Sequence, residues 1–324
     1  MEIRISVVIP TYKRPQLLTK CLQALTRQTL PRNAFEIIVV SDGPDPEAED
    51  RLQAWCQTLP GLALRWHALA EKKGPAAARN LGWRTANAAL VAFTDDDCEP
   101  APNWLEALCK AYNGHTEMVM TGRVEVPLPA APTDYEWNTA HLQTAEFVTA
   151  NCCCTVAALR ATGGFDERFS MAWREDSDLH FKLITRGIPI LRVPDAVVRH
   201  PVRPAPWGIS LYEQKKSQYN ALLYKKYPGL FRERIRSGPN WHYHITVLLF
   251  LGLLIAALLE NRTGVLLSLS GWSLSVGLFA WKRLRPTRKT VEHVAEMIVT
   301  SALIPFVSIY WHYYGAIKHK VLLF

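Results

Sequence analysis

Long uncharged apolar runs are missing from the first 240 residues of this 324-residue chain, and its cysteines lack the spacing of a zinc site. No C-x-x-C pair occurs among the seven cysteines, and Cys152, Cys153 and Cys154 are consecutive. Neighbouring cysteines make a poor disulfide framework, so we expect them to act as small buried residues in a reducing compartment. The opening MEIRISVVIP lacks a basic segment followed by a long apolar core, which predicts no secretory signal and a cytosolic first domain.

Motifs of nucleic-acid-binding proteins are also missing, although the formal net charge is +8. We therefore expect no nucleic-acid partner, and we interpret the excess positive charge as attraction to anionic lipid. Hydrophobic residues make up 49% of the chain, which is ample for a core, and from Ile245 onward uncharged stretches dominate. This asymmetry predicts a soluble, enzyme-sized domain followed by a membrane tail.

Two periodicities alternate in the first hundred residues. Strands alternating with helices favour an α/β fold, with a mainly parallel sheet flanked by helices on both faces. In such sheets, ligands bind beyond the carboxyl ends of the strands. The predicted strands are 3–9, 35–43, 62–69 and 90–94, and the predicted helices begin at Pro15 and cover 74–89.

Polar side chains follow these strands at the point where each strand ends. Three consecutive carboxylates, Asp95 to Asp97, repel one another unless they are solvated, cap a helix or are neutralised by a cation. A single acidic loop is most often a cap or a solvated turn, but the convergence of three loops favours Mg²⁺ or Mn²⁺ bridging a diphosphate. The loops PTYKRP, SDGPD and TDDDCEP would bring together Thr11, Tyr12, Arg14, Asp42, Asp95 and Asp97.

Six segments occur in an order typical of a known family: VVIPTYKRPQLL, VVSDGPD, GPAAARNLGW, FTDDDCEP, GGFDERF and WREDSDLHFKL. At these spacings they resemble glycosyltransferase family 2, whose members are inverting enzymes of the GT-A fold that use nucleotide-diphosphate sugars. The resemblance covers about residues 3–201. It implies a Rossmann-like GT-A catalytic domain, an enzyme of the hexosyltransferase type and a nucleotide-diphosphate sugar as donor.

The resemblance also implies roles on the donor side. Asp42 would bind the base of the nucleotide, and Arg79 would lie near the ribose or diphosphate unless it is a surface arginine on a helix. The D-x-D motif corresponds to Asp95 and Asp97, which would hold the nucleotide and a Mg²⁺ or Mn²⁺ ion. His200 is either a further metal ligand or a hydrogen-bonded structural residue. In an extended segment Asp96 faces the other way from its neighbours. The donor-binding set is Pro10, Thr11, Tyr12, Arg14, Asp42, Arg79, Asp95 and Asp96, and the metal set is Asp95, Asp97 and His200.

On the acceptor side, the resemblance makes Asp176 the general base, with Glu175 beside it. Acidic residues also favour the first turn of a helix, and both interpretations can hold together. Asp176 would take the proton of an acceptor hydroxyl as it attacks the anomeric carbon, and a single displacement inverts the stereochemistry. Processive family members carry a Q-x-x-R-W motif where this chain has QKKSQY, so we expect non-processive transfer of a single sugar.

Two uncharged apolar segments, 245–259 and 264–281, are separated only by ENRT. A spanning helix needs about 17–20 apolar residues, so the segments predict a helical hairpin at about 243–281. Basic residues flank the pair on both sides, and the positive-inside rule keeps both flanks in the cytoplasm. We therefore expect a cytoplasmic GT-A domain over 1–236, a membrane region over 237–324 and a location in the inner or plasma membrane.

A third apolar segment, at about 294–316, contains Pro305 and is followed by lysines. A re-entrant or interfacial helix is preferred because a third span would place Lys318 and Lys320 outside; a true span is the alternative. The predicted function is transfer of one sugar to a lipid-linked or membrane-proximal acceptor. The alternatives are a polyprenyl-phosphate sugar synthase and, from another class, a non-catalytic nucleotide-sugar-binding or scaffold membrane protein.

Overall fold

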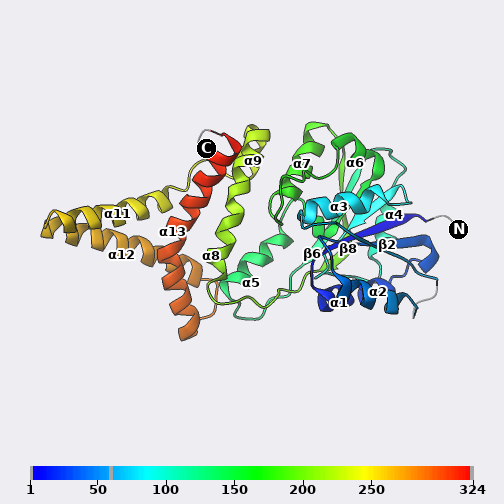
Figure 1. Ribbon diagram of the computed structural model, residues 1–324, viewed down its shortest axis with the longest axis horizontal. Coiled ribbons are helices and arrows are strands. Elements are labelled where there is room, and N and C mark those ends of the chain that lie inside the picture. Colours follow the sequence, from blue (N-terminus) through cyan, green and yellow to red (C-terminus); the bar gives the residue numbers. More distant parts are fainter. Residues whose placement is uncertain (1–2, 58–60, 322–324) are drawn as a thin grey trace. The chain divides into compact units, whose positions relative to one another are not determined.

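The computed structural model describes residues 3–57 and 61–321 and divides the chain into two compact units (Figure 1). The first unit contains residues 1–127 and 140–202, and the second contains residues 128–139 and 203–324. Residues 203–236 thus cluster with the C-terminal helices. The domain boundary that the sequence suggests near residue 236 stays a prediction.

The first unit is built on an eight-stranded sheet with the order β3-β2-β1-β4-β7-β6-β8-β5. Neighbouring strands are parallel from β3 through β2 and β1 to β4, and again between β6 and β8. The pairs β4–β7, β6–β7 and β5–β8 are antiparallel, so the sheet is mixed beyond β4. The strands are β1 (Ile5–Thr11), β2 (Phe35–Ser41), β3 (Ala63–Ala68), β4 (Leu90–Phe93), β5 (Glu99–Pro100), β6 (Val119–Glu125), β7 (Cys152–Thr155) and β8 (Ile190–Arg199).

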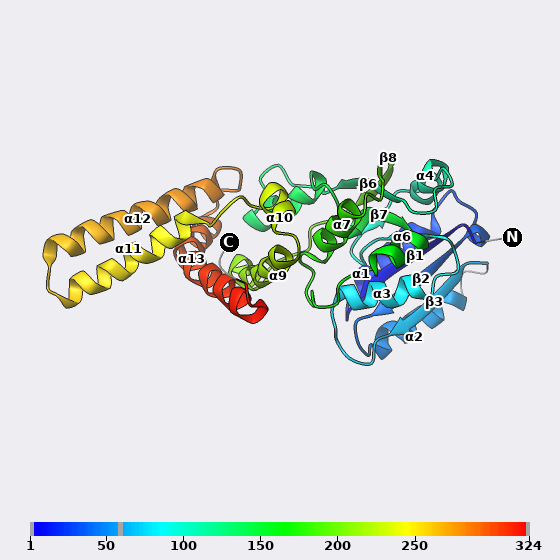
Figure 2. The same cartoon turned by 90° about the horizontal axis from the view of Figure 1, so that it is seen from above.

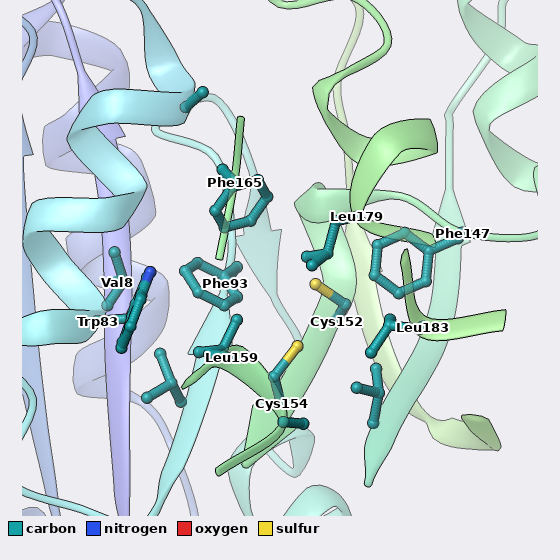
Figure 3. Packing of buried hydrophobic residues seen from close by; sticks show 14 of the residues in the cluster. Val8, Trp83, Phe93, Phe147, Cys152, Cys154, Leu159, Phe165, Leu179 and Leu183 are labelled. Atoms are coloured by element: carbon teal, nitrogen blue, oxygen red, sulfur yellow. The ribbon is translucent and has the colours of Figure 1, made fainter. Parts of the chain in front are cut away.

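Helices cover both faces of this sheet. Every residue of β1 is buried although its side chains alternate between the two faces, so both faces are covered. In one core, Trp83, Leu159 and Leu183 pack near Phe93 and Cys152 (Figure 3). The helices are α1 (Pro15–Thr26), α2 (Pro46–Gln57), α3 (Pro75–Arg84), α4 (Trp104–Ala111), α6 (Val156–Thr162) and α7 (Glu175–Thr185).

The helix expected over 74–89 is shorter than predicted. It ends at Arg84 because strand side chains take the backbone N–H groups that follow. Asn87 donates its N–H to Glu36 Oε1 (2.7 Å), and Ala88 donates its N–H to Ser6 Oγ (3.1 Å). The cysteines are buried as expected, apart from the exposed Cys56.

The second unit is helical. The helices α11 and α12 lie side by side and are joined by a short turn, so they form a hairpin (Figure 2). The helix α13 is continuous through Pro305 and does not reverse direction, and whether it spans a membrane or lies at its surface stays a prediction. The helices are α5 (Asp134–Thr139), α8 (Ile209–Glu213), α9 (Gln218–Lys226), α10 (Pro228–Arg234), α11 (Trp241–Leu258), α12 (Arg262–Leu284) and α13 (Val291–His319).

The last three helices are each long and apolar enough to cross a membrane. In the most apolar 18-residue stretch of each helix, only 6% (α11), 11% (α12) and 28% (α13) of the stretch is buried within the protein. The remaining apolar surface is far larger than soluble proteins usually expose, which fits contact with lipid.

A buried ion pair joins α5 to α12 within the second unit. Arg283 Nη2 lies 2.8 Å from Asp134 Oδ2, and the two side chains are 9% and 8% exposed. Arg283 also donates to Thr300 and Ser301 of α13 (2.7 and 3.0 Å) and to Ser210 of α8 (3.0 Å). One guanidinium therefore ties four helices together.

Candidate active site

Three loops meet at the carboxyl ends of β1, β2 and β4. The parallel register pairs Thr11 with Ser41 and Val8 with Phe93, so the three strands end at the same edge of the sheet. Asp42 donates its backbone N–H to the carbonyl of Thr11 (2.8 Å), which joins the first two loops directly. The structure therefore brings together the loops that the sequence predicts to converge.

Within the acidic loop, Asp96 has different surroundings from its neighbours. It is fully buried, accepts a hydrogen bond from Thr11 Oγ1 (2.7 Å) and lies 3.2 Å from Arg14 Nη2. Burial raises the pKa of Asp96 to about 7, although Arg14 opposes that shift. Arg14 Nη1 also lies 3.8 Å from Asp97 Oδ2. Asp96 thus fastens this loop to the end of β1.

A candidate cation site lies on this loop. One donor atom each of Asp95, Asp97, Cys98 and His200 lies within 4.8 Å of the others. His200 follows β8, its Nε2 is 3.6 Å from Asp97 Oδ1, and its buried Nδ1 has no hydrogen-bond partner among residues 3–57 and 61–321. Two carboxylates and an imidazole fit Mg²⁺ or Mn²⁺. Burial raises the pKa of the Cys98 thiol well above its usual value, so the neutral thiol is a poor ligand for such hard ions.

Arg79 is the cation between this loop and the E-D pair. It is 2% exposed, which rules out the alternative of a surface arginine. Its Nη2 lies 2.7 Å from Asp95 Oδ1, and its Nη1 lies 3.2 Å from Glu175 Oε1. Burial alone would lower the pKa of the guanidinium, but the two carboxylates raise it above its ordinary value. Arg79 is therefore a permanent buried positive charge.

The E-D pair begins α7, directly after Arg174, whose φ of 73° is left-handed. Glu175 is 4% exposed, and burial together with the charge of Asp176 raises its pKa to about 7. Asp176 is less buried than Glu175 and accepts from the backbone N–H of Ser177 (2.6 Å). The two carboxyl groups are therefore neighbours with different exposure, and Asp176 is the one that a solvent-borne acceptor reaches more easily.

Next to Asp42, the segment Lys72–Gly74 adds contacts that the motifs did not predict. Asp42 Oδ1 accepts the N–H groups of Lys73 and Gly74, both at 2.7 Å, and Lys72 Nζ lies 3.9 Å from the centre of the Tyr12 ring. Gly74 has φ of 99°, and a Cβ there would lie 2.5 Å from the carbonyl oxygen of Ser170. The glycine before Pro75 was the available signal for this turn.

Pro10 and Thr11, the last two residues of β1, also belong to the predicted site. Both are buried within β1, and the Thr11 hydroxyl group donates to Asp96. A separate cavity of about 430 Å³ lies along the ends of β6 and β8. Its lining consists of Arg123, Val124, Glu125, Val126, Pro127, Gln143 and Arg199, which includes none of the predicted site residues.

A family model for glycosyl transferase family 2 matches residues 6–161, which carry the three strand-end loops described above. Residues 6–161 form a glycosyltransferase family 2 domain. The family 2 domain also resembles named enzymes. Glycosyltransferase AglE of Haloferax volcanii is 32% identical over 132 residues, which is 41% of this chain and 43% of that protein.

Validoxylamine A glucosyltransferase of Streptomyces hygroscopicus subsp. jinggangensis is 26% identical over 281 residues, which is 73% of this chain and 64% of that protein. The pre-mycofactocin glycosyltransferase of Mycobacterium tuberculosis is 31% identical, over 60% of this chain and 42% of that protein. The matches therefore cover less than two thirds of each of these relatives.

Among solved structures, the mannosyltransferase PcManGT from Pyrobaculum calidifontis, in complex with GDP-Man and Mn²⁺, has a TM-score of 0.57 and 18% identity. The match covers 99% of this chain and 88% of that one. S. aureus TarS has a TM-score of 0.50 and 17% identity, over 81% of this chain and 54% of that one. These likenesses confirm the predicted GT-A fold, in which helices flank a central sheet.

Proposed function

We propose that this family 2 glycosyltransferase moves a single sugar, with inversion, from a nucleotide-diphosphate sugar to a lipid-linked or membrane-proximal acceptor. The observation that carries the proposal is the grouping of Asp95, Asp97 and His200 beside the E-D pair, with Arg79 in contact with both sides. Support for the donor class comes from PcManGT, a GT-A neighbour solved with GDP-Man and Mn²⁺.

On the donor side, Asp42 and Tyr12 would orient the nucleotide at the ends of β1 and β2. Asp95, Asp97 and His200 would hold a Mg²⁺ or Mn²⁺ ion, which when bound supplies positive charge for the leaving nucleoside diphosphate. The contact between Glu175 and Arg79 holds the first turn of α7, which contains Asp176, in place.

On the acceptor side, Asp176 would accept the proton of the acceptor hydroxyl while the hydroxyl oxygen attacks the anomeric carbon. The bond between that carbon and the diphosphate oxygen breaks in the same step, and the electron pair leaves with the diphosphate. Attack from the face opposite the leaving group inverts the anomeric centre. No covalent intermediate with the protein is required.

The acceptor class is proposed from the second unit. Three helices that are long and apolar enough to cross a membrane would keep the transferase at a lipid surface, so a lipid-linked or membrane-proximal acceptor is the substrate most often within reach. With basic flanks inside, the catalytic unit would face the cytoplasm. The name of one relative, glucosyl-dolichyl phosphate glucuronosyltransferase, fits a lipid-linked acceptor. A polyprenyl-phosphate sugar synthase is the second candidate. Its product would be cleaved by mild acid, whereas an ordinary glycoside would survive.

Two substitutions separate donor binding from transfer. We expect Asp97→Ala to weaken Mn²⁺-dependent binding of the nucleotide sugar, and Asp176→Asn to reduce transfer by about 100-fold or more while donor binding persists. Calorimetry over a panel of nucleotide sugars measures the first effect, and labelled product measures the second. Loss of donor binding in Asp176→Asn, or unchanged binding in Asp97→Ala, would mean that these roles are misassigned.

A further inference from the structure

Arg79 contacts two carboxylates that belong to opposite sides of the proposed reaction. Asp95 lies 16 positions away in the loop after β4, and Glu175 lies 96 positions away at the start of α7. The guanidinium is 2% exposed, so water does not screen either contact strongly. The side chain thus joins two loops that are distant in sequence.

The charges at this junction are not balanced. A single positive charge faces two carboxylates, and Arg79 makes one contact to each: 2.7 Å to Asp95 and 3.2 Å to Glu175. Within the described part of the chain, Arg79 Nε and Glu175 Oε2 are buried without a hydrogen-bond partner. Because Nη2 is on Asp95, the second of the two parallel hydrogen bonds that an arginine can give a carboxylate, from Nη2 to Glu175 Oε2, is not made.

We propose that Arg79 is a positioning residue that couples cation binding at Asp95 to the placement of Glu175 and its neighbour Asp176. The coupling rests on the proposed function, because it needs a divalent cation at Asp95. A cation there competes with the guanidinium for the Asp95 carboxylate and repels it, so the contact of Arg79 with Glu175 strengthens. Donor arrival then tightens the acceptor side of the site.

Thermodynamic reciprocity makes the coupling measurable without any reaction. If the cation shifts Arg79 towards Glu175, then removing the charge of Glu175, at a pH above its raised pKa, leaves Arg79 on Asp95, where it opposes the cation. We expect Glu175→Gln to weaken Mn²⁺ binding by about fivefold or more, the lower end of typical couplings between sites. Electron paramagnetic resonance of free Mn²⁺ measures this on the full chain in detergent, with no nucleotide present.

Two controls separate the coupling from a general loss of negative charge. Asp176→Asn removes the adjacent carboxylate, for which no Arg79 contact is found among the described residues. Its effect on Mn²⁺ binding therefore measures only the loss of a nearby negative charge. Arg79→Lys keeps the buried charge but loses the planar fork that reaches two carboxylates. In the Arg79→Lys background, the effect of Glu175→Gln should fall to the size of the Asp176→Asn effect.

The outcomes distinguish this inference from the proposed function. Equal effects of Glu175→Gln in the Arg79 and Arg79→Lys backgrounds would overturn the coupling and leave the proposed function intact. Failure of the unsubstituted chain to bind Mn²⁺ would overturn the cation site and the coupling together. If Arg79→Lys does not fold, as judged by its thermal unfolding, Arg79→Gln replaces it, because Gln also lacks the two-sided charged contact.

Discussion

The consecutive residues Asp95, Asp96 and Asp97 meet three different environments. Asp96 accepts a hydrogen bond from Thr11, Asp95 contacts Arg79, and Asp97 lies close to His200. The meeting of the loops was predictable because parallel strands end at one edge of a sheet. The burial of Arg79 was not, because an alanine-rich helix gives no sign of partners 16 and 96 positions away.

Glu175 leads to a prediction about pH. Burial and the charge of Asp176 raise its pKa from 4.5 to about 7. A carboxyl group whose pKa is raised by folding stabilises the protein while protonated, and this contribution is lost as pH rises from about 4.5 to about 7. The free energy of unfolding of the unsubstituted chain should therefore fall across this window. Glu175→Gln should make that fall shallower without removing it, because the pKa of Asp96 is also raised to about 7.

Thermal unfolding followed by circular dichroism at a series of pH values tests this. The matched control is Glu47→Gln, because the Glu47 side chain is 65% exposed and its removal should leave the slope unchanged. If stability falls with pH equally steeply in the unsubstituted chain and in Glu175→Gln, the raised pKa of Glu175 is contradicted.

At the scale of helices and strands, glycine marks one close contact in the second unit. A Cβ on Gly315 of α13 would lie 2.4 Å from the carbonyl oxygen of Gln218 in α9. Gly277 of α12 has no heavy atom of the described residues within 4 Å of a built Cβ. Both glycines lie in apolar sequence, so the pattern predicted the helices but not which glycine faces a neighbour.

This difference predicts opposite effects of one substitution. Gly315→Ala should lower the free energy of unfolding by about 1–3 kcal/mol, because the added methyl group meets backbone that must shift. Gly277→Ala should leave stability unchanged or raise it by up to about 1 kcal/mol, since alanine favours helix over glycine. Unfolding of the two variants in the same detergent measures both effects. Equal losses would mean that α9 and α13 do not pack at Gly315.

At the scale of the whole molecule, hydropathy was sufficient to predict helices at the C-terminal end, because spans must be long and apolar. It was not sufficient to associate residues 128–139 with them. That association depends on Asp134 and Arg283, which are 149 positions apart. A polar residue in a loop-like segment gives no sequence signal for a partner so far along the chain.

The proposed orientation of the C-terminal helices in a membrane can be tested by labelling. In a Cys56→Ser background, we expect Arg262→Cys, at the first residue of α12 after the turn, to react with a membrane-impermeant maleimide on intact cells. Lys289→Cys, between α12 and α13, should react only after lysis, because basic flanks stay inside. Labelling of Lys289→Cys on intact cells would contradict the cytoplasmic placement of the catalytic unit.

The pairing of Asp134 with Arg283 means that the C-terminal helices are more than a removable anchor. The polypeptide passes between the two units at Pro127, Thr139 and Val202, so residues 128–139 are an excursion from the transferase unit into the helical one. A chain cut at residue 236 would lose Arg283 and leave residues 128–139 without the ion pair that holds Asp134. Catalytic competence is therefore expected to depend on an intact helical unit even when the substrates are supplied in solution.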